Sequence, residues 1–117
     1  MTPAVIDLVI YQGATFRKSF IWQTGDPPAA VNLTGATARM QIRRKASSPT
    51  ADITLNTENG GIEITSPLTG EFLINITPEM STPVTITAGV YDLEIVQGAY
   101  VTRILMGAIT ISPEVTK

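Results

Sequence analysis

The chain has 117 residues, a formal net charge of −2 and 44% apolar residues, and it contains neither cysteine nor histidine. This length fits one domain over residues 1–117, which can bury roughly two-thirds of the surface that its unfolded chain exposes and needs no metal or disulfide to fold. The missing histidine and cysteine exclude thiol proteases, zinc hydrolases and Ser-His-Asp arrangements, and the net charge argues against a nucleic-acid binder.

Two further properties bear on where the protein works. The charged fraction of 15% is below the usual one of about a quarter, so a partner is expected to cover part of the surface. Residues 1–7 lack the basic start and apolar run of a signal peptide, and no apolar stretch approaches the ~18 residues that span a membrane. We therefore expect a soluble protein, made in a cytoplasm, that does not enter a membrane.

The first expected strand, residues 4–11, is apolar on both faces. One face carries Ala4, Ile6, Leu8 and Ile10, and the other carries Val5, Asp7, Val9 and Tyr11. Such a strand must be covered on both faces, although an N-terminal strand normally lies at a sheet edge or forms an arm. The pattern therefore predicts pairing with another chain, with the candidate interface residues Val5, Ile6, Leu8, Val9 and Ile10. The alternative is a strand integral to the chain's own sheet.

Alternation with a period of two predicts half-buried strands at residues 14–23, 36–45, 70–77 and 89–96. In the first of these, Lys18 interrupts the apolar face, which indicates a position near an edge. The expected core consists of Phe20, Trp22, Met40, Ile42, Ile74, Tyr91, Leu93 and Ile104.

Turn signals separate these strands at short intervals. Asn59-Gly60 is a favoured hairpin pair, so it predicts a hairpin between a strand near residues 53–55 and one near 62–64. Gln97-Gly98 is expected to join the last two long strands. Thr77-Pro78-Glu79-Met80 offers an N-cap, a proline at the first helical position and an acid in the first turn, which predicts a single helical turn.

The last expected strand lies within residues 100–111, where Ile104, Leu105 and Met106 put large apolar groups on both faces. This pattern predicts a central position in a packed sheet. Seven or eight short strands with such frequent turns predict an all-β fold, a β-sandwich or an open barrel, with at most one short helical turn.

The search for chemistry leaves only carboxylates. Asp92 and Glu94 share a strand face and could chelate calcium, or they could pair with Arg39 or Arg103 across the sheet. The basic run at residues 43–45 is expected to be a solvated strand end, and most aromatic residues fall on inward positions. We therefore expect no enzyme, no cofactor, no metal and no small-molecule substrate.

Several segments together resemble a known group of proteins. They are residues 11–16 (YQGATF), 33–43 (LTGATARMQIR), 70–72 (GEF), 89–94 (GVYDLE), 101–107 (VTRILMG) and 112–116 (SPEVT). In this order they resemble small proteins of tailed bacteriophages and prophages and the β-rich N-terminal domains of phage baseplate upper proteins. The resemblance implies an immunoglobulin-like or related antiparallel sandwich and a structural role in the virion. It implies no catalytic residues.

The resemblance favours an adaptor in the tail, baseplate or neck, which forms a homo-oligomer or is present in several symmetry-related copies and binds other virion proteins. Because the chain stops at Lys117, without the receptor-binding region of baseplate upper proteins, direct host binding is not expected. The virion would be assembled in the host bacterial cytoplasm. The alternatives are a capsid decoration protein, a carbohydrate-binding module with an exposed aromatic strip, and a hydrolase using two carboxylates.

Overall fold

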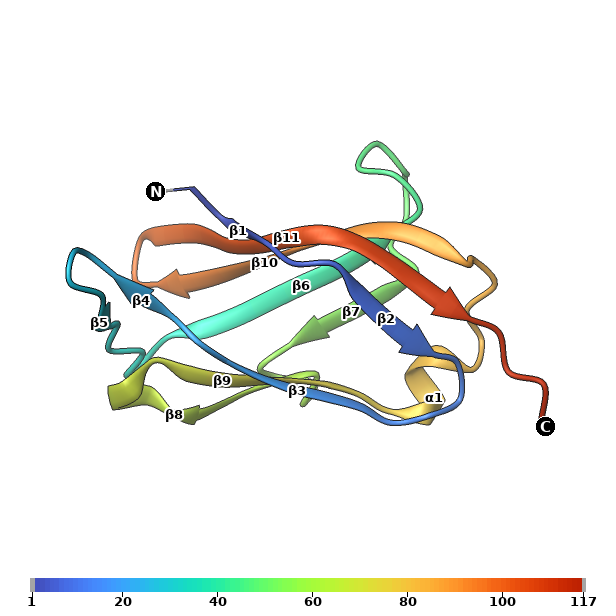
Figure 1. Cartoon of the computed structure of the whole chain (residues 1–117), viewed down its shortest axis with the longest axis horizontal. Helices are drawn as coiled ribbons and strands as arrows, with labels where there is room; N and C mark the ends of the chain where they lie inside the picture. The colour runs from blue at the N-terminus through green and yellow to red at the C-terminus, as the bar shows by residue number, and fades with distance from the viewer. Residues whose placement is uncertain (1, 117) are drawn as a thin grey trace.

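The computed structural model describes residues 2–116 and shows two packed β-sheets with one short helix (Figure 1). The strand segments and short helices are β1 (Ala4–Val5), β2 (Leu8–Tyr11), β3 (Phe16–Ile21), β4 (Gln23–Thr24), β5 (Ala29–Ala30), β6 (Thr37–Arg43), β7 (Ile53–Asn56), β8 (Ile62–Ser66), η1 (Pro67–Thr69), β9 (Glu71–Ile76), α1 (Pro78–Ser81), β10 (Ala88–Gln97) and β11 (Tyr100–Ser112). The predicted all-β sandwich is confirmed.

The two layers differ in size. The large sheet has the strand order β1-β11-β10-β6-β7, and β2 also pairs with β11. The small sheet has the order β3-β9-β8, and β4 and β5 form a separate short hairpin after β3. Figure 1 shows the large sheet above and the small sheet below, with the apolar core between their inner faces. All pairings are antiparallel except those of β1 and β2, which run parallel to β11.

The core agrees with the expected alternation. Met40, Ile42, Ile74, Tyr91, Leu93 and Ile104 are buried as predicted. Phe20 and Trp22 are only half-buried and pack against the core from its side. Phe20 belongs to β3, an edge strand of the small sheet that has a neighbour on one side only, and Trp22 follows directly after this strand. The aromatic ring of Phe20 stacks on that of Phe72, with 5.5 Å between the ring centroids.

The turn at Asn59 differs from the predicted hairpin. Here β7 belongs to the large sheet and β8 to the small sheet, so the turn carries the chain from one layer to the other. The side-chain oxygen Oδ1 of Asn59 accepts hydrogen bonds from the backbone N–H groups of Asn56 (3.0 Å) and Gly61 (2.8 Å). These bonds hold the crossover turn in place of the ladder that a hairpin would supply.

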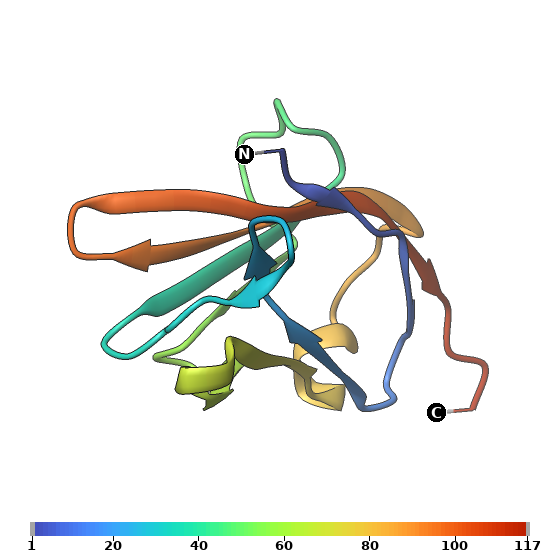
Figure 2. The ribbon, with the colours of Figure 1, turned by 60° about the vertical axis from the view of Figure 1, so that its left-hand side comes forward.

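Two other turn predictions are confirmed. Gln97 pairs with Tyr100 across the loop that joins β10 to β11, and this hairpin projects at the left of the molecule in Figure 2. The segment before Pro83 forms the expected single turn, α1, in which the Thr77 side chain accepts a hydrogen bond from the backbone N–H of Met80.

A β-bulge in β11 explains its two apolar faces. Leu93 pairs with Leu105 and Glu94 pairs with Arg103, so Ile104 is an extra residue opposite β10. The extra residue shifts the alternation, and Ile104 and Leu105 both lie buried in the core while Met106 lies partly exposed on the outer face. The predicted central position of β11 is confirmed, but the chain itself does not cover the outer face there.

Replacing Leu93 with alanine tests this core. Leu93 is completely buried between the neighbouring strands at Met40 and Leu105. The cavity should lower the free energy of unfolding by about 2–5 kcal/mol, measured by urea denaturation. The matched control is Leu68→Ala, because Leu68 is exposed and its truncation should change stability by less than about 0.5 kcal/mol. Equal losses in the two variants would contradict the core assignment.

Candidate functional site

The N-terminal strand, in which the sequence predicted an interface, forms one edge of the large sheet. Its two segments share a single register with β11: Val5 pairs with Met106 and Leu8 pairs with Ile109. No other strand pairs with β1 or β2 within residues 2–116. The strand is therefore integral to the chain's own sheet, and its second side is open.

The two faces of this edge strand have different environments. Leu8 and Ile10 are buried in the core, whereas Val5 is 71% exposed and Val9 is 48% exposed. The sequence predicted that another chain would help to cover this strand. The structure corrects this for the inner face, which packs against the chain's own core. The side chains of Leu8 and Ile10 are not accessible to a partner, so the candidate interface is reduced to the outer residues and the backbone.

The backbone of the edge strand presents unpaired groups to the outside. The N–H of Ile6 donates to the carbonyl of Met106 (2.9 Å) and the N–H of Gln12 donates to that of Ser112 (3.0 Å). Since successive residues of a strand direct these groups to alternate sides, the even-numbered residues pair with β11 and Val9 faces away from it. The N–H and carbonyl of Val9 thus lie on the open side, next to an exposed apolar side chain.

Ile6 and Asp7, which lie between β1 and β2, interrupt the hydrogen-bond ladder that joins the N-terminal strand to β11. The hydroxyl of Tyr91 donates to the carbonyl oxygen of Ile6 (2.6 Å), and the N–H of Ala108 donates to Asp7 Oδ1 (2.9 Å) instead of a strand carbonyl. The opposite residue of β11 is Gly107, where a side chain would collide with the Ile6 carbonyl oxygen. Three side-chain choices therefore fix the path of the edge strand.

The two edge strands of the small sheet, β3 and β8, carry features that discourage strand pairing. Lys18 of β3 lies on the inward side near the Phe20 ring, as the sequence predicted for a residue near an edge. A register shift distorts β8 between Glu63 and Ser66. Inward charges and irregular pairing both protect edges from other chains. At the β1–β2 edge the outward positions hold Val5, Asp7 and Val9, and the Asp7 carboxylate is turned toward β11, where it accepts a hydrogen bond from the Ala108 N–H.

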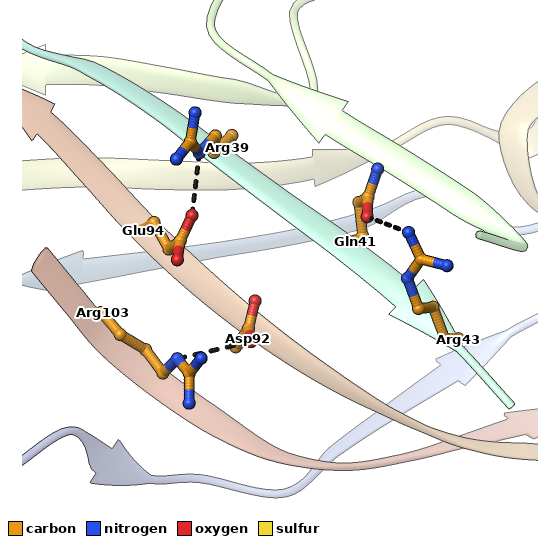
Figure 3. A network of polar contacts seen from close by, with 6 residues as sticks. All are labelled: Arg39, Gln41, Arg43, Asp92, Glu94 and Arg103. Carbon is orange, nitrogen blue, oxygen red and sulfur yellow. Dashed lines mark hydrogen bonds and ion pairs between the residues drawn. The ribbon is translucent and has the colours of Figure 1, made fainter. Parts of the chain in front are cut away.

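Below we call the solvent side of the large sheet the outer face. It holds the acidic pair singled out in the sequence (Figure 3). Glu94 accepts from Arg39 Nε at 2.8 Å, and Asp92 lies 3.4 Å from Arg103 Nε. The predicted arginine partners are confirmed, and both ion pairs are substantially exposed. Among residues 2–116 no group of three or more His, Cys, Asp or Glu side chains gathers in a metal-binding arrangement.

A cluster around Gln12 was missed by the sequence interpretation. Its amide Nε2 donates to the carbonyls of Thr82 and Val84 (both 2.9 Å), and its Oε1 accepts from the N–H of Glu114 (3.0 Å). The neighbouring Gly13 N–H donates to the buried hydroxyl of Ser81. These bonds attach the end of β2 to the α1 region and to the C-terminal segment. The only signal in the sequence was the position of Gln12 between an expected strand and a glycine.

Exposed aromatic residues do not form a strip in the described part of the chain. Tyr11 and Tyr100 are the exposed aromatics among these residues. Tyr11 lies opposite Ser112 at one end of β11, while Tyr100 begins that strand at the other end. A sugar-stacking platform needs aromatic rings side by side, so this arrangement does not favour carbohydrate binding.

Replacing Tyr91 with phenylalanine tests the attachment of the edge strand. Burial, with a smaller contribution from the Asp7 carboxylate, raises the pKa of Tyr91 from 10.0 to about 12. A pKa that folding raises adds stability below its unfolded value and loses it as the pH rises toward the folded value. The wild-type protein should therefore lose stability between about pH 10 and pH 12, and Tyr91→Phe should lack this component.

At neutral pH Tyr91→Phe should also lower the free energy of unfolding by about 1–2 kcal/mol, because the Ile6 carbonyl loses its donor. Both effects are measured by urea denaturation as a function of pH. Tyr100→Phe is the matched control, since Tyr100 is 80% exposed, and it should behave as the wild type. An unchanged alkaline profile in Tyr91→Phe would refute the role of this hydroxyl.

Replacing Asp92 with asparagine and Glu94 with glutamine together tests the acidic pair. Exposed ion pairs contribute roughly 0–1 kcal/mol each, so the double variant should remain folded with a melting temperature close to that of the wild type. Adding calcium should not change the melting temperature of either protein. A calcium-dependent rise that disappears in the double variant would show that the pair binds the cation.

Comparison with known proteins adds no assignment. No protein-family model matches the chain, and a search of curated proteins finds no significant match. Within residues 2–116 no helix is long and apolar enough to cross a membrane. Among the described residues, the open β1–β2 edge and the outer face of the large sheet are the surfaces on which a function can be proposed.

Proposed function

We propose that the protein is a non-catalytic structural component of a bacteriophage particle, an adaptor that joins other virion proteins in the tail, baseplate or neck. The single observation that carries the proposal is the open β1–β2 edge, where Val9 combines unpaired backbone groups with an exposed side chain. The sequence resemblance to small phage virion proteins supplies the setting. Asp92 and Glu94 on the outer face are paired with Arg103 and Arg39. These ion pairs account for the two acidic residues without a catalytic role.

The edge can bind an extended segment of another virion protein by adding a strand to the large sheet. Backbone hydrogen bonds to Val9 would supply affinity, and the alternation of Val5 and Val9 with the inward residues would set the register. A mispaired partner, shifted by one residue, would place its apolar side chains on the wrong face.

A short edge gives a modest contact, which suits a protein present in several copies. β2 contains four residues, so one added strand forms few hydrogen bonds. When several copies are arranged with symmetry, the linked contacts bind far more tightly than one contact alone. The proposal therefore includes several symmetry-related copies in the particle.

The double variant Val5→Lys and Val9→Lys tests this function. Both side chains are exposed, so the stability of the isolated protein should change by about 0.5 kcal/mol or less. An incoming strand would meet two charges, and incorporation into particles should fall strongly. The measurement is the amount of the protein in particles purified from a host that produces each variant.

The matched control is Val101→Lys, at an exposed position of the β10–β11 hairpin away from this edge, which should be incorporated normally. Deleting residues 1–10 is a weaker test, because the deletion removes Leu8 and Ile10 from the core and should unfold the protein. Normal incorporation of the double variant would disprove the role of the edge. Absence of the wild-type protein from purified particles would disprove the virion function.

A further inference from the structure

The outer face contains a hollow whose lining includes no residue of β1 or β2. It has a volume of about 540 Å³ and lies beside the loop between β6 and β7. Figures 1 and 2 show this loop standing away from the large sheet. Val90, Met106 and Ala46 form apolar parts of its lining, and Gln41, Arg43 and Asp92 are among its polar residues.

A second hollow continues the first across the face. It has a volume of about 400 Å³ and shares Gln41 and Asp92 with the first. Its remaining lining includes Arg39, Asn56 and Glu94, from three neighbouring strands. Together the two hollows form a trough whose lining is partly apolar at the first hollow and polar at the second.

Arg43 is the cation of this trough that has no carboxylate partner among residues 2–116. Its guanidinium donates to Gln41 Oε1 and to the Ser48 carbonyl oxygen, both at 2.7 Å, and both acceptors are neutral. The ion pairs of the face use Arg39 and Arg103 instead (Figure 3). The two hydrogen bonds hold the half-buried guanidinium in one orientation, while its charge is not neutralised.

We propose that the trough binds an acidic extended segment of a partner protein, with a glutamate or aspartate carboxylate on Arg43 and the apolar side chain two residues away, on the same face of the segment, against Val90 and Met106. An oriented guanidinium recognises a carboxylate through two parallel hydrogen bonds, which a flexible ammonium group does not provide. The trough borders the edge strand, because Met106 pairs with Val5, but no residue of β1 or β2 lines it, so the proposal does not depend on the virion role.

The charge around the trough favours an acidic peptide over a nucleic acid. Arg43, Arg44 and Lys45 are consecutive cations, but Asp92 and Glu94 lie on the same face and the chain carries a net charge of −2. Because Asp92 and Glu94 are paired with arginines, Arg43 leaves the trough with one uncompensated positive charge, which suits one carboxylate better than a polyanion with a charge at every unit. A peptide can place one carboxylate at Arg43 and uncharged groups beside the acidic residues.

The probe for this proposal is the blocked pentapeptide Leu-Ser-Glu-Ser-Leu, in which the single glutamate and both leucines share one face when the peptide is extended. It is titrated into ¹⁵N-labelled protein and followed by NMR. The amide shifts that change should cluster at residues 41–48, 90–92 and 103–107. The same peptide with glutamine in place of glutamate should have a Kd about tenfold higher or more, because the charge-assisted hydrogen bond is lost. Shifts that map elsewhere, or no shifts at peptide concentrations of several millimolar, would overturn the proposal.

Variants separate Arg43 from its neighbours. Arg43→Gln should weaken peptide binding about tenfold or more, whereas Arg44→Gln, which changes the next residue in the chain and is outside the lining, should change it less than about twofold. If Arg43→Gln fails to fold, Arg43→Lys keeps the charge without the fork and should give an intermediate loss. Equal binding by these variants would overturn the assignment, and so would tighter binding of a single-stranded oligothymidine to the same residues.

Discussion

The hydrogen bond from the Tyr91 hydroxyl to the Ile6 carbonyl is the contact on which the exposed edge depends. It joins residues 85 positions apart in the chain, and it forms because Gly107 leaves room for the Ile6 carbonyl oxygen. With Ile6 held there, the strand continues in register, and Leu8 and Ile10 enter the core. The same register places the side chains of Val5 and Val9 on the outer face of the large sheet. Their exposure is therefore a consequence of the pairing between the N-terminal strand and β11.

The two candidate surfaces make different demands on a partner. The β1–β2 edge offers backbone groups, so it accepts many sequences that can extend into a strand. The trough offers one oriented guanidinium beside apolar side chains. In the proposed complex this combination would select for a negative charge at a defined position. A molecule that carries both can join two partners at once, or can contact one partner at two sites that reinforce each other.

The alternation of apolar residues was sufficient to predict the sandwich, the half-buried strands and most of the core. It did not predict the bulge in β11: the run Ile104, Leu105 and Met106 breaks the alternation, but the sequence does not show that Ile104 is an inserted residue. The pair Asn59-Gly60 predicts a tight turn correctly as a local structure, but local chemistry does not say whether the next strand joins the same sheet. Layer assignment is a property of the whole fold.

The candidate site was predictable only in outline for the same reason. The sequence located an unusual strand at residues 4–11, but its two apolar faces looked equivalent. Only the packed structure distinguishes Leu8 and Ile10, inside, from Val5 and Val9, outside. The contacts of Gln12 and Tyr91 join residues 70 and 85 positions away, and no local pattern records such partners. The arginine partners of Asp92 and Glu94 were predictable because they lie on neighbouring strands.

The pairing of the first strand with the last also determines when the fold can be completed. Asp7 and Ala108 are 101 positions apart, so the N-terminal segment leaves the ribosome long before its partner strand exists. Contacts between distant residues close slowly, since the chain entropy of a large loop must be lost first. During synthesis the apolar segment at residues 4–11 is therefore exposed and unpaired, and the time until β11 emerges is the period in which the nascent chain is most vulnerable to misassembly.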